Sequence, residues 1–172
     1  MEAAKHEFEM AAADSNRAAT IIRSHDYVGD YDLWAAKAFR LNVFANRAEA
    51  LRLVALQTDK GRAMEAFRAV QEYLEMEPDS EKSLTAHLAG AKMLLETGHG
   101  DSALIEYKGL LEKTPDLADA WLGVGLALSQ SGDLKEFREA EYYLTRFLEL
   151  APDNHPMKAD IENTVKYMKT GR

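Results

Sequence analysis

Several residue types that support particular chemistries are missing or scarce in this chain. The sequence of 172 residues contains no cysteine, which excludes disulfides, thiolate metal sites and a cysteine nucleophile. Its 21 lysines and arginines are outnumbered by 29 aspartates and glutamates, so the formal net charge is -8. Phosphate backbones demand clustered basic side chains. We therefore expect neither nucleic acid nor an anionic membrane as the main partner.

Long apolar runs are also missing. No run approaches the roughly 20 residues that span a bilayer, so we expect no membrane insertion. The first residues, from Met1 to Glu7, are polar and acidic instead of basic and then apolar, so no secretory signal is visible. We expect a soluble protein of the cytoplasm or the periplasm, because a lack of thiols suits both compartments.

Strand signals are almost absent as well. β-branched residues are sparse and alternating patterns do not persist, whereas Ala, Leu, Glu, Lys, Met and Arg dominate. This composition predicts an all-α protein. Helix-breaking sequences divide the chain at 58–61, 77–80, 97–100, 114–116, 131–133 and 151–153. We expect Gly61, Gly98 and Gly132 to cap helices in the left-handed conformation.

Three of the four prolines recur at one interval. Each begins a Pro-Asp dipeptide, and Pro78, Pro115 and Pro152 are 37 residues apart. Matched columns precede them: leucine at 74, 111 and 148, glutamate at 75, 112 and 149, and alanine at 66, 103 and 140. A period of about 20–50 residues is typical of a solenoid whose units bury their apolar faces against neighbours. The repeat therefore favours a binding surface over a reaction centre.

The repeated unit resembles the tetratricopeptide repeat, a helix-turn-helix unit of about 34 residues. The residues that carry the resemblance in the third unit are Trp121, Gly125, Gly132, Ala140, Leu144, Phe147 and Pro152. Those of the second are Ala91, Gly98, Ala103, Tyr107, Leu110 and Pro115. The first unit is a weaker copy, with Gly61, Ala66, Val70, Tyr73 and Pro78. The resemblance implies a right-handed superhelical array of antiparallel helix pairs.

This pattern divides the chain into five parts. We expect N-terminal helices of a degenerate unit at 1–46, repeats at 47–80, 84–117 and 118–153, and a C-terminal capping helix at 154–172. Gly29 and Asp30 resemble the turn between the two N-terminal helices, and no proline separates 33–45 from the next helix, so one continuous helix remains an alternative. Three extra residues within 134–138 lengthen the turn or the second helix of the third repeat.

The last helix carries one apolar stripe, which consists of Met157, Ile161, Val165 and Met168. A stripe of this kind is typical of a helix that covers the exposed end of a last repeat. A docking helix for a partner is the alternative.

Candidate chemical sites are few. No two histidines have the i, i+4 spacing that lets two imidazoles share a metal on one helix. Asp26, Asp30 and Asp32 lack the ligand spacing of a calcium loop, and helix capping explains them better. The Gly123-Val124-Gly125 sequence lies in a helical pattern without a preceding strand, so its small residues predict close helix packing instead of a nucleotide loop. We expect no catalysis, no metal and no cofactor.

In the tetratricopeptide family, the first helices of successive units line a concave groove that binds an extended peptide or a helix. The groove residues that the resemblance implies here are Leu51, Ala55, Thr85, Leu88, Lys92, Leu95, Asp119, Leu122, Leu126, Ser129 and Gln130. Family members that clamp a terminal carboxylate use several basic residues, whereas this groove offers only Lys92. We therefore do not expect a carboxylate clamp.

The groove leucines predict an apolar or amphipathic ligand segment. Alternatively, they pack on the chain's own N-terminal helix or on a second copy in a homo-oligomer. Glu96 and Asp119 form an acidic rim that favours a partner carrying some positive charge.

Two functional hypotheses follow from the resemblance. The first is a non-catalytic scaffold or adaptor that holds another protein or peptide segment in a multi-subunit assembly. The alternative is a dedicated chaperone for a secreted or envelope-complex client.

Overall fold

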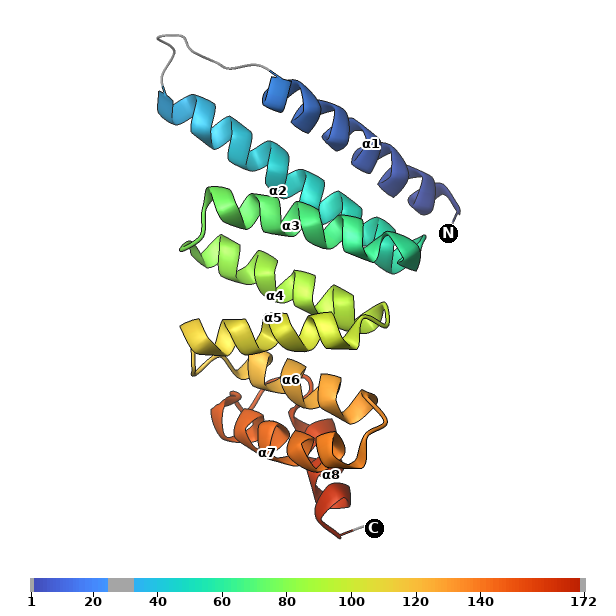
Figure 1. Ribbon diagram of the computed structural model, residues 1–172, viewed down its shortest axis with the longest axis vertical. Helices are drawn as coiled ribbons and strands as arrows, with labels where there is room; N and C mark the ends of the chain where they lie inside the picture. The colour runs from blue at the N-terminus through green and yellow to red at the C-terminus, as the bar shows by residue number, and fades with distance from the viewer. Residues whose placement is uncertain (1, 25–32, 171–172) are drawn as a thin grey trace. The chain divides into compact units, whose positions relative to one another are not determined.

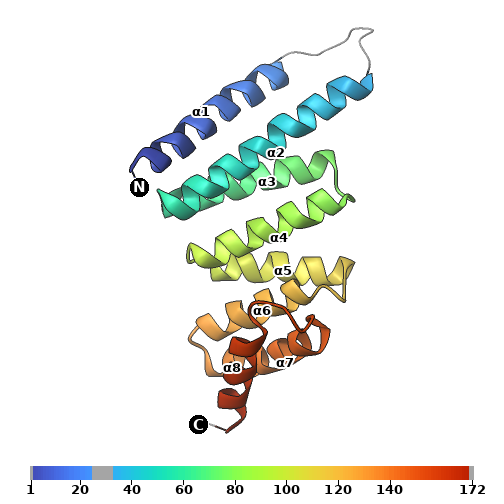
Figure 2. The same ribbon diagram turned by 180° about the vertical axis from the view of Figure 1, so that it is seen from behind.

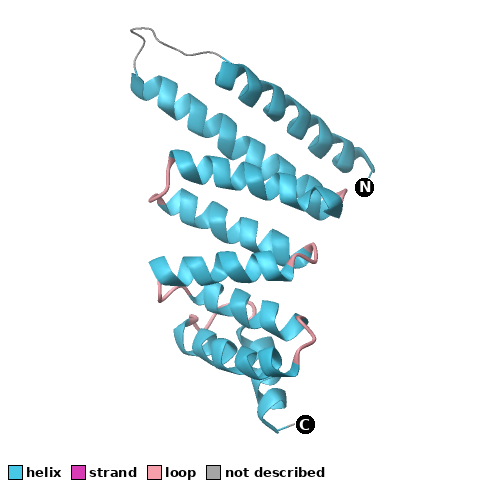
Figure 3. Ribbon diagram, in the orientation of Figure 1, coloured by secondary structure: helices cyan, strands magenta, loops and turns pink. Residues whose placement is uncertain are grey.

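The computed structural model of the protein describes residues 2–24 and 33–170, and within these ranges it contains α-helices, one 3-10 turn and no strand (Figure 3). The prediction of an all-α protein is therefore confirmed. The elements are α1 (Glu2–Ser24), α2 (Leu33–Gln57), η1 (Lys60–Arg62), α3 (Ala63–Met76), α4 (Glu81–Glu96), α5 (Gly100–Lys113), α6 (Ala118–Gln130), α7 (Leu134–Leu150) and α8 (Lys158–Thr170).

The chain forms two compact units, Met1–Thr97 and Gly98–Arg172. Unit 1 contains α1 to α4, and unit 2 contains α5 to α8. The division falls in the turn between α4 and α5, the two helices expected to pair as the second repeat. Right-handed superhelical stacking of the repeats stays a prediction.

Local capping chemistry explains several helix ends. Ser80 and Asp133 begin α4 and α7 by accepting hydrogen bonds from backbone N–H groups in the first turn, from Ser83 at 3.0 Å and from Lys135 at 2.6 Å. Gly98 and Gly132 have φ values of 88° and 81°, which confirms the left-handed conformation predicted for both.

The same prediction is wrong for Gly61. This residue lies in the helical turn η1, and its N–H donates to Asp59 Oδ1 at 2.9 Å. Asp59 caps η1, which leads directly into α3, so the backbone needs no left-handed residue there.

Within unit 1, α2 is one uninterrupted helix of 25 residues that lies beside α1 and α3 (Figures 1 and 2). It also packs against α4. Its buried residues include Ala50, Leu51, Val54 and Ala55. A helix with neighbours on several sides has apolar residues around much of its circumference. The alternative of a continuous helix is thus confirmed, and the expected boundary after residue 46 falls inside α2. The Gly29-Asp30 turn lies outside the described residues.

Hydrogen bonds between charged and polar side chains link α1 to α2 and α3. Glu72 of α3 accepts hydrogen bonds from Arg23 of α1 and from Arg47 of α2. Arg47 also donates to Asn16 Oδ1 at 2.6 Å. Beside this network, Ala19 and Phe44 form a buried cluster with Tyr73. One carboxylate therefore satisfies two guanidinium groups from two helices.

We expect Glu72→Gln to lower the free energy of unfolding by about 1–2 kcal/mol, because a neutral amide cannot satisfy both guanidinium groups. Urea denaturation followed by far-UV circular dichroism measures the change. Glu75→Gln is the matched control, since Glu75 lies exposed on the same helix. Equal stabilities of the two variants would contradict a structural role for Glu72.

A buried apolar cluster in unit 2 has members from α6, α7, α8 and the α7–α8 connection. The buried residues are Leu122, Leu144, Phe147, Ala151, Ile161 and Val165, and Met157 and Met168 pack against them. The apolar stripe of α8 is thus buried against its own chain. α7 has 17 residues, whereas α3 and α5 have 14 each, so the extra residues lengthen the second helix.

Across residues 2–24 and 33–170, no helix combines the length and the apolar character that crossing a membrane requires.

Candidate functional site

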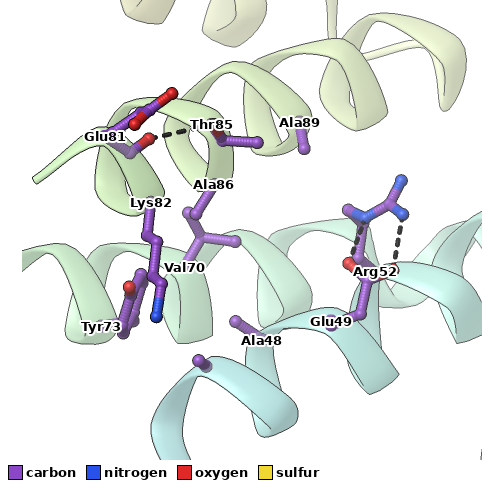
Figure 4. Close-up of a pocket in the computed structure, with 11 residues that line it drawn as sticks. Ala48, Glu49, Arg52, Val70, Tyr73, Glu81, Lys82, Thr85, Ala86 and Ala89 are labelled. Carbon is purple, nitrogen blue, oxygen red and sulfur yellow. Dashed lines mark hydrogen bonds and ion pairs between the residues drawn. The ribbon is translucent and has the colours of Figure 1, made fainter. Parts of the chain in front are cut away.

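A hollow of about 450 Å³ opens in unit 1 between α2 and α4, with α3 as its floor (Figure 4). It is lined by Ala45, Ala48, Glu49, Arg52, Val70, Tyr73, Glu81, Lys82, Thr85, Ala86 and Ala89. We call this feature the unit 1 hollow. Four of its lining residues are alanines, so the space exists because the helices carry short side chains where they face each other.

Helical periodicity explains which residues line the unit 1 hollow. The residues from α2 lie at positions 45, 48, 49 and 52, which is the i, i+3, i+4, i+7 pattern of a single helix face. α4 supplies 81, 82, 85, 86 and 89 by the same rule. Val70 and Tyr73 of α3 are buried and form the floor. The hollow is therefore apolar at its base.

Charged groups surround this apolar base. Arg52 donates from Nε and Nη2 to the two carboxylate oxygens of Glu49, both at 2.8 Å (Figure 4). This hydrogen bonding raises the pKa of Arg52, burial opposes the rise, and the negative charge of Glu96 adds to it. Lys82 has no ion-pair partner in the part of the chain that the structure describes.

Two predicted groove residues of unit 1 are core residues instead. Leu51 and Ala55 are 0% exposed, so they offer no surface to a ligand. They lie on the side of α2 next to the hollow-lining face, and that side is filled by the chain's own packing. Thr85 does line the unit 1 hollow.

The other three predicted residues of unit 1 lie outside the hollow lining. Leu88 is half-buried, and Leu95 is buried. Lys92 is exposed and forms an ion pair with Glu96 at 3.8 Å.

The predicted groove residues of unit 2 are partly covered by the chain itself. Leu122 is 8% exposed and belongs to one cluster with Ile161 and Val165 of α8, against which Leu126 also packs. The idea of self-packing therefore holds for these leucines, but their partner is the C-terminal helix and not the N-terminal one.

The polar groove residues of unit 2 have local partners or face solvent. Asp119 Oδ1 lies 3.2 Å from His155 Nε2, and Ser129 donates to the carbonyl oxygen of Leu126 at 2.8 Å. Gln130 is exposed. Since Glu96 pairs with Lys92 and Asp119 with His155, both carboxylates of the expected acidic rim have a basic neighbour.

Sequence reasoning missed Glu49, Arg52 and Lys82. The signal that could have found the α2 residues is the stripe that begins at Ala45 and recurs at helical spacing. Equivalent repeat positions alone favoured Leu51, because they do not specify how far a helix is rotated about its axis.

Within the described ranges, no group of three or more histidine, aspartate or glutamate side chains is arranged to hold a metal ion. Asp26, Asp30 and Asp32 lie outside those ranges.

The chain was compared with protein-family models and with known proteins. No protein-family model matches the chain. The chain is 31% identical over 103 residues to Tetratricopeptide repeat protein 13 of Homo sapiens, a stretch that covers 59% of this chain and 12% of that protein. The chain thus spans about an eighth of the length of the relative. The similarity and the helical architecture fit a tetratricopeptide-like repeat protein.

Proposed function

We propose that the chain is a non-catalytic protein-interaction scaffold or adaptor, which binds an apolar or amphipathic segment of a partner protein in a multi-subunit assembly. The observation that carries this proposal is the unit 1 hollow, with alanines on its walls and charges around its opening. Its occupant is a partner segment that inserts at least one large apolar side chain.

The alanine walls determine what suits the hollow. Ala45, Ala48, Ala86 and Ala89 leave room above Val70 and Tyr73 for a side chain larger than their own methyl groups. Burying a leucine, phenylalanine or methionine side chain supplies about 1.5–3 kcal/mol. Recognition of a segment along a helix-lined groove uses the same apolar anchoring.

The surrounding charges would orient the segment. The Arg52–Glu49 pair belongs to α2, and Glu81 and Lys82 belong to α4. Charges of both signs on the two walls favour a partner segment whose own charged residues flank its apolar anchor. These charges determine the orientation in which the segment binds more than they increase its affinity.

The repeat pattern supports the same function. Tetratricopeptide-like repeats commonly hold other proteins, and the similarity reported above concerns a protein of that name. The repeat boundaries at 47–80, 84–117 and 118–153, and the capping role of 154–172, remain parts of the proposal.

The test blocks the unit 1 hollow without disturbing the core. Thr85 is an exposed residue of α4 that lines the hollow, so Thr85→Trp fills the space from its rim. We expect peptides selected from a random library on the unmodified protein to share a large apolar residue. Their affinity for Thr85→Trp should fall about tenfold or more, as the loss of one buried anchor implies.

Gln71→Trp is the matched control, because Gln71 is an exposed residue of α3 that does not line the hollow. Isothermal titration calorimetry on the two variants gives the affinities, and circular dichroism verifies their folding. Peptides that bind both variants equally well would refute the assignment of the hollow as the binding site.

A further inference from the structure

Three aromatic side chains meet on the surface of unit 2. Trp121 of α6 lies 5.9 Å from Tyr142 of α7 with the rings at 74°, and 5.4 Å from Tyr143 with the rings at 36°. Tyr142 and Tyr143 are 5.4 Å apart at 79°. We call this group the aromatic corner. Tyr142 is 63% exposed, so the corner reaches solvent.

The indole ring of Trp121 is held in a fixed orientation. Its Nε1–H donates to the carbonyl oxygen of Pro115 at 2.7 Å. Its ring also packs against the core that contains Phe147 and Leu144. The indole N–H is already hydrogen-bonded and part of the ring is packed against the core. A ligand can therefore contact Trp121 only through the remaining surface of its ring.

A hollow of about 410 Å³ adjoins the aromatic corner. It is lined by Trp121, Tyr142, Thr145, Arg146 and Glu149. Arg146 Nη1 donates to Glu149 Oε2 at 2.6 Å, while no hydrogen bond occupies Glu149 Oε1 in the described part of the chain. One carboxylate oxygen therefore stays available beside the rings.

Carboxylates act on two residues at and beside this hollow. The hydrogen bond that Arg146 donates to Glu149 is the main cause that raises the pKa of Arg146, and the negative charge of Asp116 contributes. On the other side, burial and then the charge of Glu139 raise the pKa of Tyr143. Glu149, Asp116 and Glu139 thus place negative charge near the hollow and the aromatic corner.

We propose that the aromatic corner binds an arginine side chain from a basic segment of a partner protein. The guanidinium stacks on the exposed ring surface of Trp121 and Tyr142 and donates to Glu149 Oε1.

Arginine suits the site better than other side chains do. A guanidinium is planar and weakly hydrated, so it can stack on an aromatic ring and donate in its own plane at the same time. A lysine ammonium is a compact, strongly hydrated point charge that makes no such planar stack. An apolar side chain would leave the carboxylates around the hollow unmatched, and an acidic one would be repelled by them.

Arg146, which lines the hollow, does not itself occupy the proposed position on the rings. Arg146 is engaged by Glu149, and the cation–π contact found in the described part of the chain joins Arg23 to Phe44 in unit 1. A second copy of the chain is a poor occupant, because two molecules with a formal charge of -8 repel each other. A basic partner gains from the same charge.

The test uses two short glycine-serine peptides, one with arginine at its centre and one with the neutral isostere citrulline. We expect the arginine peptide to shift the indole N–H signal of Trp121 in nuclear magnetic resonance titrations at low salt, and to bind more weakly as salt is added. The citrulline peptide should cause no comparable shift. Trp121→Phe assigns the indole signal.

Three substitutions separate the roles of ring and charge. Tyr142→Ala should weaken binding of the arginine peptide about two- to fivefold, as expected for one exposed cation–π contact, whereas Tyr142→Phe keeps the ring and should retain the affinity. Glu149→Gln should weaken binding and flatten its salt dependence. Both positions are at or near the surface, and circular dichroism checks that the variants fold.

Three results would overturn this inference. The first is equal binding of the arginine and citrulline peptides, and the second is an undiminished affinity of Tyr142→Ala for the arginine peptide. The third is an indole signal that moves when the protein is diluted without any peptide, which would identify a second copy of the chain as the occupant. The site lies in unit 2, so its failure would leave the function proposed for the unit 1 hollow untouched.

Discussion

Gly123→Ala is expected to destabilise unit 2 by at least about 2 kcal/mol, as overpacking of a tight core does. A Cβ atom at this position would lie 2.3 Å from the ring of Tyr107, far inside van der Waals contact. Tyr107 is buried, so its ring has no free space to move into. Helix propensity alone predicts the opposite sign, because alanine is favoured over glycine in a helix by about 1 kcal/mol. The sign of the change therefore reports the close approach of α5 and α6.

Gly109→Ala is the matched control for that experiment. Gly109 lies within α5, and an added Cβ would meet no atom within 4 Å. The Gly109→Ala substitution should therefore stabilise the protein by about 0.5–1 kcal/mol. Urea denaturation of both variants gives the two free energies. If Gly123→Ala proved as stabilising as Gly109→Ala, the packing of Tyr107 against Gly123 would be wrong.

The close approach at Gly123 was expected from sequence, as were most helix ends. Both depend on local chemistry: a proline stops a helix, Ser80 or Asp133 caps one, and a run of small residues lets a neighbour come close. Gly61 shows the limit of such rules. A glycine after a helix permits the left-handed conformation without requiring it, and the Asp59 cap selected a helical turn instead.

The candidate site was less predictable than the fold. Repeat columns identified α2 and α4 as the walls and included Thr85, but they assigned Leu51 and Ala55 to the surface, although both are buried. The rotation of a helix about its axis is decided by all its neighbours together, and α2 packs against three helices. The periodicity of one helix face in the sequence does not show how these three neighbours together determine the rotation of α2.

The packing of α8 over Leu122 was also not predictable from one helix alone. The stripe on the last helix predicted that it buries a face, but not which residues it would cover. Its position follows from connections beyond the helix itself: Lys158 Nζ donates to the carbonyl oxygen of Ala151 at 2.9 Å and to Asp153 Oδ1 at 2.8 Å, and His155 lies beside Asp119. These links between the end of α7 and the start of α8 orient the helix.

Phe147→Ala is expected to lower the free energy of unfolding of unit 2 by about 3–5 kcal/mol. Phe147 is fully buried, lies in the cluster that joins α6, α7 and α8, and meets the ring of His155 edge-on at 4.9 Å. Truncation leaves a cavity beneath Ile161 and Val165, and it removes the ring that supports the connection to α8. We therefore expect α8 to become the first site of proteolytic cleavage.

Leu134→Ala is the control in the same helix, because Leu134 is 80% exposed, and a change within about 0.5 kcal/mol is expected there. Urea denaturation measures both free energies, and limited proteolysis with mass spectrometry locates the first cut. If Phe147→Ala lost stability while α8 stayed as resistant as in the unmodified protein, Phe147 would support α6 and α7 alone. If it lost no more stability than Leu134→Ala, the cluster around Phe147 would not stabilise unit 2. Since Leu122 shares this cluster, the expected result would also explain why that leucine serves packing and not ligand binding.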